Sequence, residues 1–539
     1  MKPNPEKKEI SRRHFIAIAG GVAGLATLAS MGLVKGFSKN ERKLNPAAIG
    51  ATNHQTDVLV IGSGMAGLFA AVKASDAGAR VMMVSKGRLG ASGQTPFAKG
   101  IFAYDPAQAR MSIDEFVENV SRSALGTNNP VYTRQLAAHS LDRVNELKAW
   151  GFFDSPLYFN AFNKPIEARG IPVIERIVVT HLIEENGKIT GAAGFGLDDE
   201  KVHFFEAKSV ILCTGAGGFK PNGFPICDLT HDGTAMAYRI GAMVTGKEWT
   251  DGHFAQAENA AACYDGWHGM FDKKPEITSV EIHHDLGVEM SYQAYMKGGP
   301  LKMEPPGMSE NKNIEGGPYR PPGFDHQGPP EEGDGPPRGR RRPPEGDGRP
   351  EGPPPGMQGY IVGGASAGMS IHKSEGLVPV NDKCASNIPG LFAAGDALGS
   401  HMAGGIYTQI GSSLAGSAVQ GAIAGEAAAE YSPGVDDAII SEIKRAEIKA
   451  EILAPLKRES GYSPAWVTQT LQGIMIPNFV LYIKKESLLK GALTYIEELR
   501  DHHLPMLRAA DMHELRLAHE TANMVLNAEM KLRASLFRT

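Results

Sequence analysis

The chain has 539 residues, of which 42% are hydrophobic, and a formal net charge of −5. At about 150 residues per domain, this length predicts roughly three domains. The nearly balanced charge, with no basic or aromatic-rich region, argues against nucleic-acid binding. The four cysteines lie at 213, 227, 263 and 384 and form no CxxC or CxxCH motif. This spacing argues against an iron–sulfur cluster, a zinc site and a c-type haem.

The N-terminal stretch SRRHFIAIAGGVAGLATLASMGLVKG places Arg12 and Arg13 before a long apolar run rich in glycine and alanine. The arginine pair resembles a twin-arginine export signal. The run is also long enough for a membrane anchor, although its many glycines and alanines make a weak spanning helix. We therefore expect export to the periplasm or to the outer face of the cytoplasmic membrane. Membrane association through this segment stays open, because AIG at 48–50 is only a candidate cleavage site.

After a polar linker over residues 34–55, residues 57–86 predict a βαβ unit: DVLVIG, then MAGLFAAVKASDAG, then RVMMVSK. The first turn reads GSGMAG, which in this context is a dinucleotide-binding fingerprint. Gly62 would make the tight turn, Gly64 would admit a pyrophosphate, and Gly67 would let helix and strand pack closely. The N-terminus of the helix, at Met65 and Ala66, would face the phosphates.

Further along, residues 131–150 predict an amphipathic helix, and 173–197 and 201–213 predict strands. The last strand ends in TGAGG, which suggests that Thr214 and Gly215 lie near a cofactor. Residues 305–356 hold 15 Pro and 12 Gly. This composition predicts a disordered or polyproline-like insertion, and its RGRRRPP run is interpreted as part of a solvated loop rather than an anionic docking patch. From about residue 436 the pattern is helical.

Five stretches occur together and in order: VLVIGSGMAGLFAA, VSKGRLGASG, AKSVILCTGAGG, DLTHDGTAMAYRIGA and IPGLFAAGDA with GSSLAGSAVQGAIAG. Over about residues 56–300 and 357–539 the chain thereby resembles flavoproteins of the succinate dehydrogenase/fumarate reductase type. The resemblance implies an α/β fold: a Rossmann-like FAD-binding domain (51–227 and 358–433), an inserted α+β capping or substrate domain (228–357) and a C-terminal helical domain (434–539). Residues 1–50 would be the signal and linker.

The resemblance also implies FAD as cofactor and a set of cofactor-binding residues. Ser85 and Lys86 stand where many dinucleotide folds carry an acidic ribose ligand. Membrane-bound members carry a histidine linked to FAD near Gly93, and no histidine occurs there, so we expect non-covalent FAD. Asp396 would contact the ribityl or phosphate region, and a helix starting near Ser412 would stabilise charge on reduced flavin. The predicted set is Gly62, Gly64, Met65, Ala66, Gly67, Ser85, Lys86, Gly93, Thr214, Gly215, Asp396, Ser412, Ser413 and Leu414. No metal ligand is predicted.

At the substrate end, the resemblance places His253 at the substrate, with Glu248 supporting the turn before it. A second family histidine is replaced by Gly359. The arginines that clamp the acid and transfer the proton are absent from HMAGGIYTQI and GVEMSYQ. Without these cations, fumarate or succinate is not expected as the substrate. Tyr407 is similar in its setting to a tyrosine of flavin ketosteroid dehydrogenases and is the second catalytic candidate. Other aromatic or basic candidates are Tyr292, Tyr295 and His401.

Two kinds of function remain open. The first is an exported FAD-dependent oxidoreductase that transfers hydride between flavin N5 and a carbon next to a carbonyl or carboxylate of a small-molecule substrate. It would exchange electrons with a separate partner. The second is a flavin-binding electron carrier or scaffold without substrate chemistry. A vestigial flavin fold used for adhesion is the weakest alternative. The chain also stops at ASLFRT, where relatives look set to continue, so a shorter C-terminal domain and a truncated one both remain open.

Overall fold

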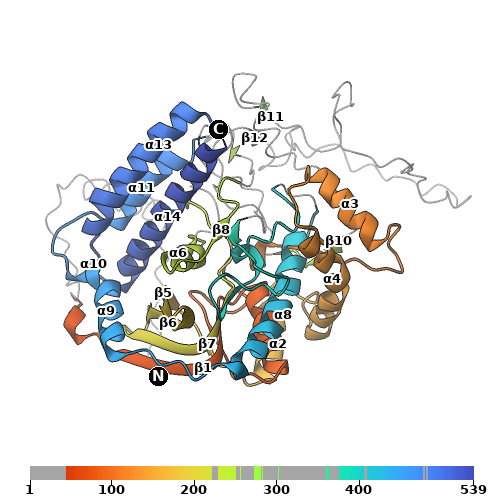
Figure 1. Ribbon diagram of the computed structural model, residues 1–539, viewed down its shortest axis with the longest axis horizontal. Helices are drawn as coiled ribbons and strands as arrows, with labels where there is room; N and C mark the ends of the chain where they lie inside the picture. The colour runs from red at the N-terminus through yellow and green to blue at the C-terminus, as the bar shows by residue number, and fades with distance from the viewer. Residues whose placement is uncertain are drawn as a thin grey trace, which may run out of the picture. The chain divides into compact units, whose positions relative to one another are not determined.

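A seven-stranded mixed sheet forms the centre of the α/β part (Figure 1). The computed structural model describes residues 44–220, 229–249, 375–405, 409–477 and 484–538, with short pieces at 255–256, 272–278, 280, 282, 301–302, 360–362 and 480. The strand order is β4-β2-β1-β7-β6-β5, with β14 pairing beside β7. The strands are β1 (Ala51–Ile61), β2 (Val81–Val84), β4 (Val173–Ile174), β5 (Ile177–Glu185), β6 (Lys188–Gly196), β7 (Val202–Leu212) and β14 (Leu391–Ala393).

The sheet combines a parallel half with an antiparallel arm. Strands β4, β2, β1, β7 and β14 pair in parallel, whereas β5, β6 and the first half of β7 form an antiparallel meander. Asn186 and Gly187 join β5 to β6 with positive φ at both residues, as the Asn-Gly sequence of a tight hairpin favours. Residues 51–55, which we predicted to be linker, form the first half of β1 because they pair with β7. That half alternates between exposed and half-buried residues.

Helices α2 (Met65–Asp76) and α8 (Ser412–Tyr431) lie side by side (Figure 1). Both are rich in glycine and alanine, and most of their residues are buried. A Cβ at Gly421 would lie 2.3 Å from the carbonyl oxygen of Ala66, and one at Gly425 would lie 2.4 Å from that of Ala70. The two helices can therefore approach this closely only because these positions carry no side chain.

Further helices and short strands surround this core. They include α3 (Ile113–Ser123), α4 (Pro130–Trp150), α5 (Phe159–Glu167), α6 (Asp232–Arg239), β3 (Gly100–Phe102) paired with β10 (Glu276–Thr278), and β8 (Val244–Thr245) paired with β13 (Gly376–Leu377). The predicted helix over 131–150 is confirmed as α4. Of the predicted capping domain, β9 (Ala255–Gln256), β11 (Leu301–Lys302) and β12 (Tyr360–Val362) are also described, as one small sheet. The insertion 305–356 and the apolar N-terminal stretch lie outside the described residues.

The C-terminal part is helical, as the sequence predicts. Its helices are α9 (Glu442–Ile452), α10 (Ala454–Lys457), α11 (Pro464–Met475), α13 (Glu486–Glu498) and α14 (Met512–Phe537). Helices α11, α13 and α14 pack together around their own apolar core, which includes Leu471, Ile496 and Val525 (Figure 1). Within the part of the chain that the structure describes, no helix is long and apolar enough to cross a membrane.

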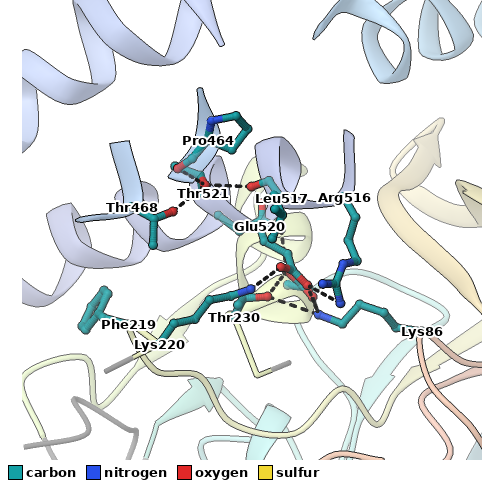
Figure 2. A network of polar contacts seen from close by, with 12 residues as sticks. Lys86, Phe219, Lys220, Thr230, Pro464, Thr468, Arg516, Leu517, Glu520 and Thr521 are labelled. Atoms are coloured by element: carbon teal, nitrogen blue, oxygen red, sulfur yellow. Dashed lines mark hydrogen bonds and ion pairs between the residues drawn. The ribbon is translucent and has the colours of Figure 1, made fainter. Parts of the chain in front are cut away.

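A buried ion network joins α14 to the α/β part (Figure 2). The side chain of Glu520, only 1% exposed, accepts hydrogen bonds from Lys86 Nζ at 2.8 Å and Lys220 Nζ at 2.5 Å. Arg516 lies 3.8 Å from the same carboxylate. Lys86 Nζ also contacts Asp232 Oδ2 at 2.8 Å. A residue that follows β2 is thus held by carboxylates from α6 and from the C-terminal helix.

The charges in this network stabilise one another. Burial alone would raise the pKa of Glu520, but Lys86 and Lys220 outweigh it and hold that pKa below its usual range. For Asp232, too, burial would raise the pKa, but the charge of Lys86 outweighs it and the pKa stays low. Burial would lower the pKa of Lys86, but its two carboxylate partners, Asp232 and Glu520, raise it. All three groups are therefore charged at neutral pH, and removing one would leave the others buried without compensation.

Gly421→Ala tests the close contact between α2 and α8. The added methyl group would meet the Ala66 carbonyl, and overpacking of this kind costs about 1–3 kcal/mol. The control is Gly473→Ala in α11, where a Cβ meets nothing within 4 Å, so alanine should stabilise the helix by about 0.5–1 kcal/mol. Chemical denaturation of both variants should give opposite signs. Equal effects at the two positions would contradict the packing argument.

Glu520→Gln tests the ion network. Because it leaves Lys86 and Lys220 with too little negative charge, it should lower the unfolding free energy at pH 7 by about 3 kcal/mol. The pKa of Glu520 is lowered by folding, so its contribution is present above the unfolded value, near 4.5, and is lost as the pH falls through the folded value. The difference in melting temperature between the variant and the wild type should thus shrink below pH 4.5.

The matched control for this prediction is Glu486→Gln, which removes an exposed carboxylate paired with Lys490 on α13. Its melting temperature should stay close to that of the wild type at every pH. A difference between Glu520→Gln and wild type that did not change with pH would show that packing, and not charge, explains the effect.

Candidate functional site

The turn between β1 and α2 presents bare backbone to a cavity. Gly62 has a φ of 113°, and a Cβ there would lie 2.2 Å from the carbonyl oxygen of Cys213. A Cβ at Gly67 would lie 1.9 Å from the carbonyl oxygen of Gly62, so the first turn of α2 packs closely against the turn that follows β1. Gly64 caps α2 without a side-chain hydrogen bond, and the Met65 N–H donates to the Thr95 hydroxyl at 3.1 Å. Gly64, Met65 and Ala66 at this helix N-terminus line the cavity. Such a terminus favours an anionic ligand.

The cavity has a volume of about 490 Å³ and lies at the carboxyl ends of the parallel strands. Residues that follow β1, β2, β7 and β14 meet there, because parallel strands end at the same edge of a sheet. Twelve of the fourteen predicted cofactor-binding residues line it: Gly62, Gly64, Met65, Ala66, Ser85, Lys86, Gly93, Thr214, Gly215, Asp396, Ser413 and Leu414. Gly67 and Ser412 do not, since Gly67 packs behind the turn and the Ser412 hydroxyl donates to the Gln409 carbonyl at 2.9 Å.

A second helix N-terminus reaches the same cavity. Gly411 precedes α8 with a φ of 84°, and Ser413 and Leu414 in the first turn of α8 line the cavity. Nine residues separate Ser412 from Gly421, the position that touches Ala66 at the start of α2. At 1.5 Å per residue, α8 therefore starts about 14 Å along its own axis from this contact. The predicted helix start at Ser412 is confirmed.

The predicted ribose ligands have partners within the protein. The Ser85 hydroxyl is hydrogen-bonded to the Ser63 hydroxyl at 2.6 Å. The Lys86 ammonium is paired with the carboxylates of Asp232 and Glu520. Its charge is therefore compensated by these two carboxylates and does not stand alone in the cavity wall. Asp232 itself lines the cavity and accepts hydrogen bonds from Thr230 and Asn523, each at 2.8 Å.

Asp232 is a site residue that our sequence reasoning missed. Its signal was present, because the stretch DLTHDGTAMAYRIGA places an acid in the first turn of a short helix directly after a loop. The pairing of Lys86 with Glu520 had no such signal, since 434 positions separate the two residues.

Both predicted catalytic residues, His253 and Tyr407, lie outside the described residues, as do Tyr292 and Tyr295. The segments that lead to them do meet. A Cβ at Gly405 would lie 2.5 Å from the ring of Trp249, and Thr245 Oγ1 lies 3.2 Å from His401 Nε2. His401, whose pKa is lowered by burial, is bonded to this neighbouring segment and does not line the cavity. Glu248 forms an ion pair with Arg538 at 3.0 Å.

The residues that line the cavity fit FAD in their chemistry. A glycine turn and the N-terminus of α2 suit the pyrophosphate, and the N-terminus of α8 suits the ring system. Between the two, Gly395 has a φ of 69°, and a Cβ there would lie 3.0 Å from the Ala66 side chain. Asp396 follows at the cavity wall. The backbone therefore lines the length of the cavity without filling it.

Comparison with known proteins also indicates that the chain binds FAD. Residues 57–160 match the FAD binding domain family. A curated relative, an uncharacterized FAD-dependent oxidoreductase of Methanocaldococcus jannaschii, is 24% identical over 90% of this chain and 92% of its own length. One chain of the CoM/CoB fumarate reductase of Methanothermobacter marburgensis is 27% identical over 37% of this chain, and the matched part is 42% of its own length.

Solved structures share the fold. Quinol fumarate reductase of E. coli matches with a TM-score of 0.67 at 17% identity, covering 90% of this chain and 90% of its own. The Sdh1 complex of Mycobacterium smegmatis matches with a TM-score of 0.66 at 23% identity, covering 90% and 87%. The predicted fold class and cofactor are confirmed. The chain is therefore an FAD-dependent oxidoreductase with the fold of the succinate dehydrogenase and fumarate reductase flavoproteins.

Proposed function

We propose that this chain is exported and transfers hydride between flavin N5 and a carbon next to a carbonyl or carboxylate, in a substrate other than fumarate or succinate. The observation that carries the proposal is the cavity between two helix N-termini, lined by bare backbone and matched to FAD. When bound, FAD supplies the two-electron chemistry. The chain supplies the binding, the orientation and the charge around it.

The residues around the cavity have separable tasks in this proposal. Backbone N–H groups at the start of α2 hold the pyrophosphate. Lys86 and Asp232, fixed by their ion pair, form the wall of the same cavity and restrict how the cofactor lies. The N-terminus of α8 favours negative charge at the ring system. Each task depends on main-chain geometry or on a paired charge, and none of them requires a covalent bond to the cofactor.

His253 and Tyr407 would act on the substrate from two adjacent segments. His253 follows Trp249 by four positions and Tyr407 follows Gly405 by two, and the Trp249 ring is in contact with the backbone of Gly405. This contact supports a shared site for the two side chains. A histidine and a tyrosine suit a carbonyl, because each can donate a hydrogen bond or a proton to its oxygen.

The substrate class follows from what the sequence lacks. A dicarboxylate needs cationic partners, and HMAGGIYTQI contains no arginine. Relatives named fumarate reductase and L-aspartate oxidase match over less than half of their own lengths, so their reactions do not define this one. An α,β-unsaturated ketone or monocarboxylate needs less positive charge and fits the proposed pair of side chains better.

Electrons would come from, or pass to, a separate protein. The structural relatives include quinol fumarate reductase and the Sdh1 complex, which supports an electron-transfer partner for this chain also. Export by the twin-arginine route is consistent with a cofactor inserted during folding, before translocation.

The hydride transfer is tested by reducing the bound FAD anaerobically and mixing it with unsaturated ketones and acids. At least one should reoxidise the flavin, as its absorbance would report. His253→Ala and Tyr407→Phe should each lower kcat/KM about 10²–10⁴-fold, because each loses a proton donor in the transition state. His513→Ala, which alters an exposed histidine of α14, is the control.

An electron carrier or scaffold would behave differently in the same experiment. Its reduced flavin would pass electrons to a one-electron acceptor such as ferricyanide, but no small organic molecule would reoxidise it or shift its absorbance. That result would remove the enzyme proposal while leaving FAD binding intact. The observation that favours this second function is the absence of arginine from HMAGGIYTQI and GVEMSYQ.

Non-covalent attachment and export have direct measurements. After acid precipitation of the protein, all of the flavin should remain in the supernatant, and yellow colour in the pellet would disprove the non-covalent bond. In cells, Arg12→Lys together with Arg13→Lys should retain the protein in the cytoplasm, whereas Lys7→Arg together with Lys8→Arg should not. Unchanged distribution of the first variant would rule out the twin-arginine route.

A further inference from the structure

Lys99 is a buried cation in the wall of the cofactor cavity. Its residue is 8% exposed, and it lies between the short helix η2 (Thr95–Phe97) and β3. Its Nζ donates a hydrogen bond to the carbonyl of Pro156 at 2.9 Å and lies 4.4 Å above the centre of the Tyr158 ring. Both contacts orient the ammonium, and neither neutralises its charge.

The other buried lysines show what Lys99 lacks. Lys247 lies 2.6 Å and Lys531 lies 3.4 Å from the carboxylate of Glu375. Lys86, also in the cavity wall, has two carboxylates at 2.8 Å. Within the described ranges, Lys99 forms no ion pair, and burial lowers its pKa. A charge held in this way is costly unless something in the cavity compensates it.

The backbone that directly follows Lys99 lies at the α8 end of the cavity. In β3, directly after Lys99, Phe102 donates its N–H to the Gly411 carbonyl at 3.1 Å. A Cβ at Gly100 would lie 3.5 Å from the side chain of Ile410 and 3.8 Å from the Cα of Gly411. The lysine and the N-terminus of α8 therefore reach the same end of the cavity, where the ring system of FAD would lie.

The ring system gains charge when it is reduced. Two electrons and one proton added to oxidised FAD leave one net negative charge on the ring, and the electrons come from the donor that is oxidised. A positive group close by stabilises the reduced form relative to the oxidised form. We propose that Lys99 is the residue whose charge raises the reduction potential of the bound FAD. The inference rests on the cofactor and is independent of the substrate proposed above.

A purely structural role is the competing explanation. Lys99 could serve only to satisfy the Pro156 carbonyl and to pack on Tyr158, whose hydroxyl donates to the Ala98 carbonyl at 2.7 Å. That role would affect folding or cofactor retention, and the potential of the retained cofactor would not change. The two roles therefore predict different measurements.

The test is the midpoint potential of the FAD-loaded protein, measured at pH 7 by spectral titration against a reference dye. Lys99→Met and Lys99→Gln should each lower the ratio of reduced to oxidised FAD at a fixed potential at least tenfold, which is about 30 mV for a two-electron couple. Lys99→Arg should keep the wild-type potential, because the positive charge remains. Lys164→Met is the control, since Lys164 also donates to a backbone carbonyl, that of Ala149, but is exposed and away from the cavity.

Three results would overturn the proposal. A wild-type potential in both uncharged variants would show that the charge does not act on the flavin. Loss of FAD or of the folded state in both would assign the ammonium to the Pro156 and Tyr158 contacts instead. An equal shift in Lys164→Met would mean that the potential follows overall charge. Activity enters none of these measurements, so failure of the substrate proposal would leave the result unaffected.

Discussion

The close approach of α2 and α8 is the constraint on which the site depends. The two helices meet backbone to backbone at Gly421 and Gly425, where a single added carbon would collide with a main-chain oxygen. Their separation is thereby set by the main chain and not by side-chain rotamers. Because α2 starts at the pyrophosphate turn and α8 starts about 14 Å along its own axis from its contact with α2, this contact fixes how the two anion-favouring ends are placed relative to each other.

Charge is distributed unequally between these two ends. At the pyrophosphate end, Lys86 is paired with Asp232 and Glu520, and Glu520 also faces Lys220 and Arg516, so each charge there has a partner of opposite sign. At the other end, α8 and Lys99 both contribute positive potential. The difference suits a cofactor whose phosphates keep their charge throughout the reaction while its ring system gains and loses charge.

Local sequence patterns predicted most of the fold because the elements follow hydrophobic periodicity and glycine punctuation. The turn at Gly62, the helix start at Ser412 and the α4 helix all come from such patterns. The first half of β1 did not, because residues 51–55 are polar and become a strand only by pairing with β7. For the same reason no pattern linked Lys86 to Glu520, since their contact exists only after the C-terminal helices dock on the α/β part.

Substrate recognition is harder to predict from the sequence than cofactor binding. FAD presents the same phosphates and the same ring to every protein that binds it, so its cradle can be recognised from glycine spacing and strand order. A substrate is recognised by a few side chains on loops, and a loop residue can change without disturbing the sheet. Here Trp249 and Gly405 precede the proposed substrate residues His253 and Tyr407 by four and two positions, and a bare backbone position at Gly405 again permits a close contact. The same device that fixes the cofactor therefore also brings together the two segments that would choose the substrate.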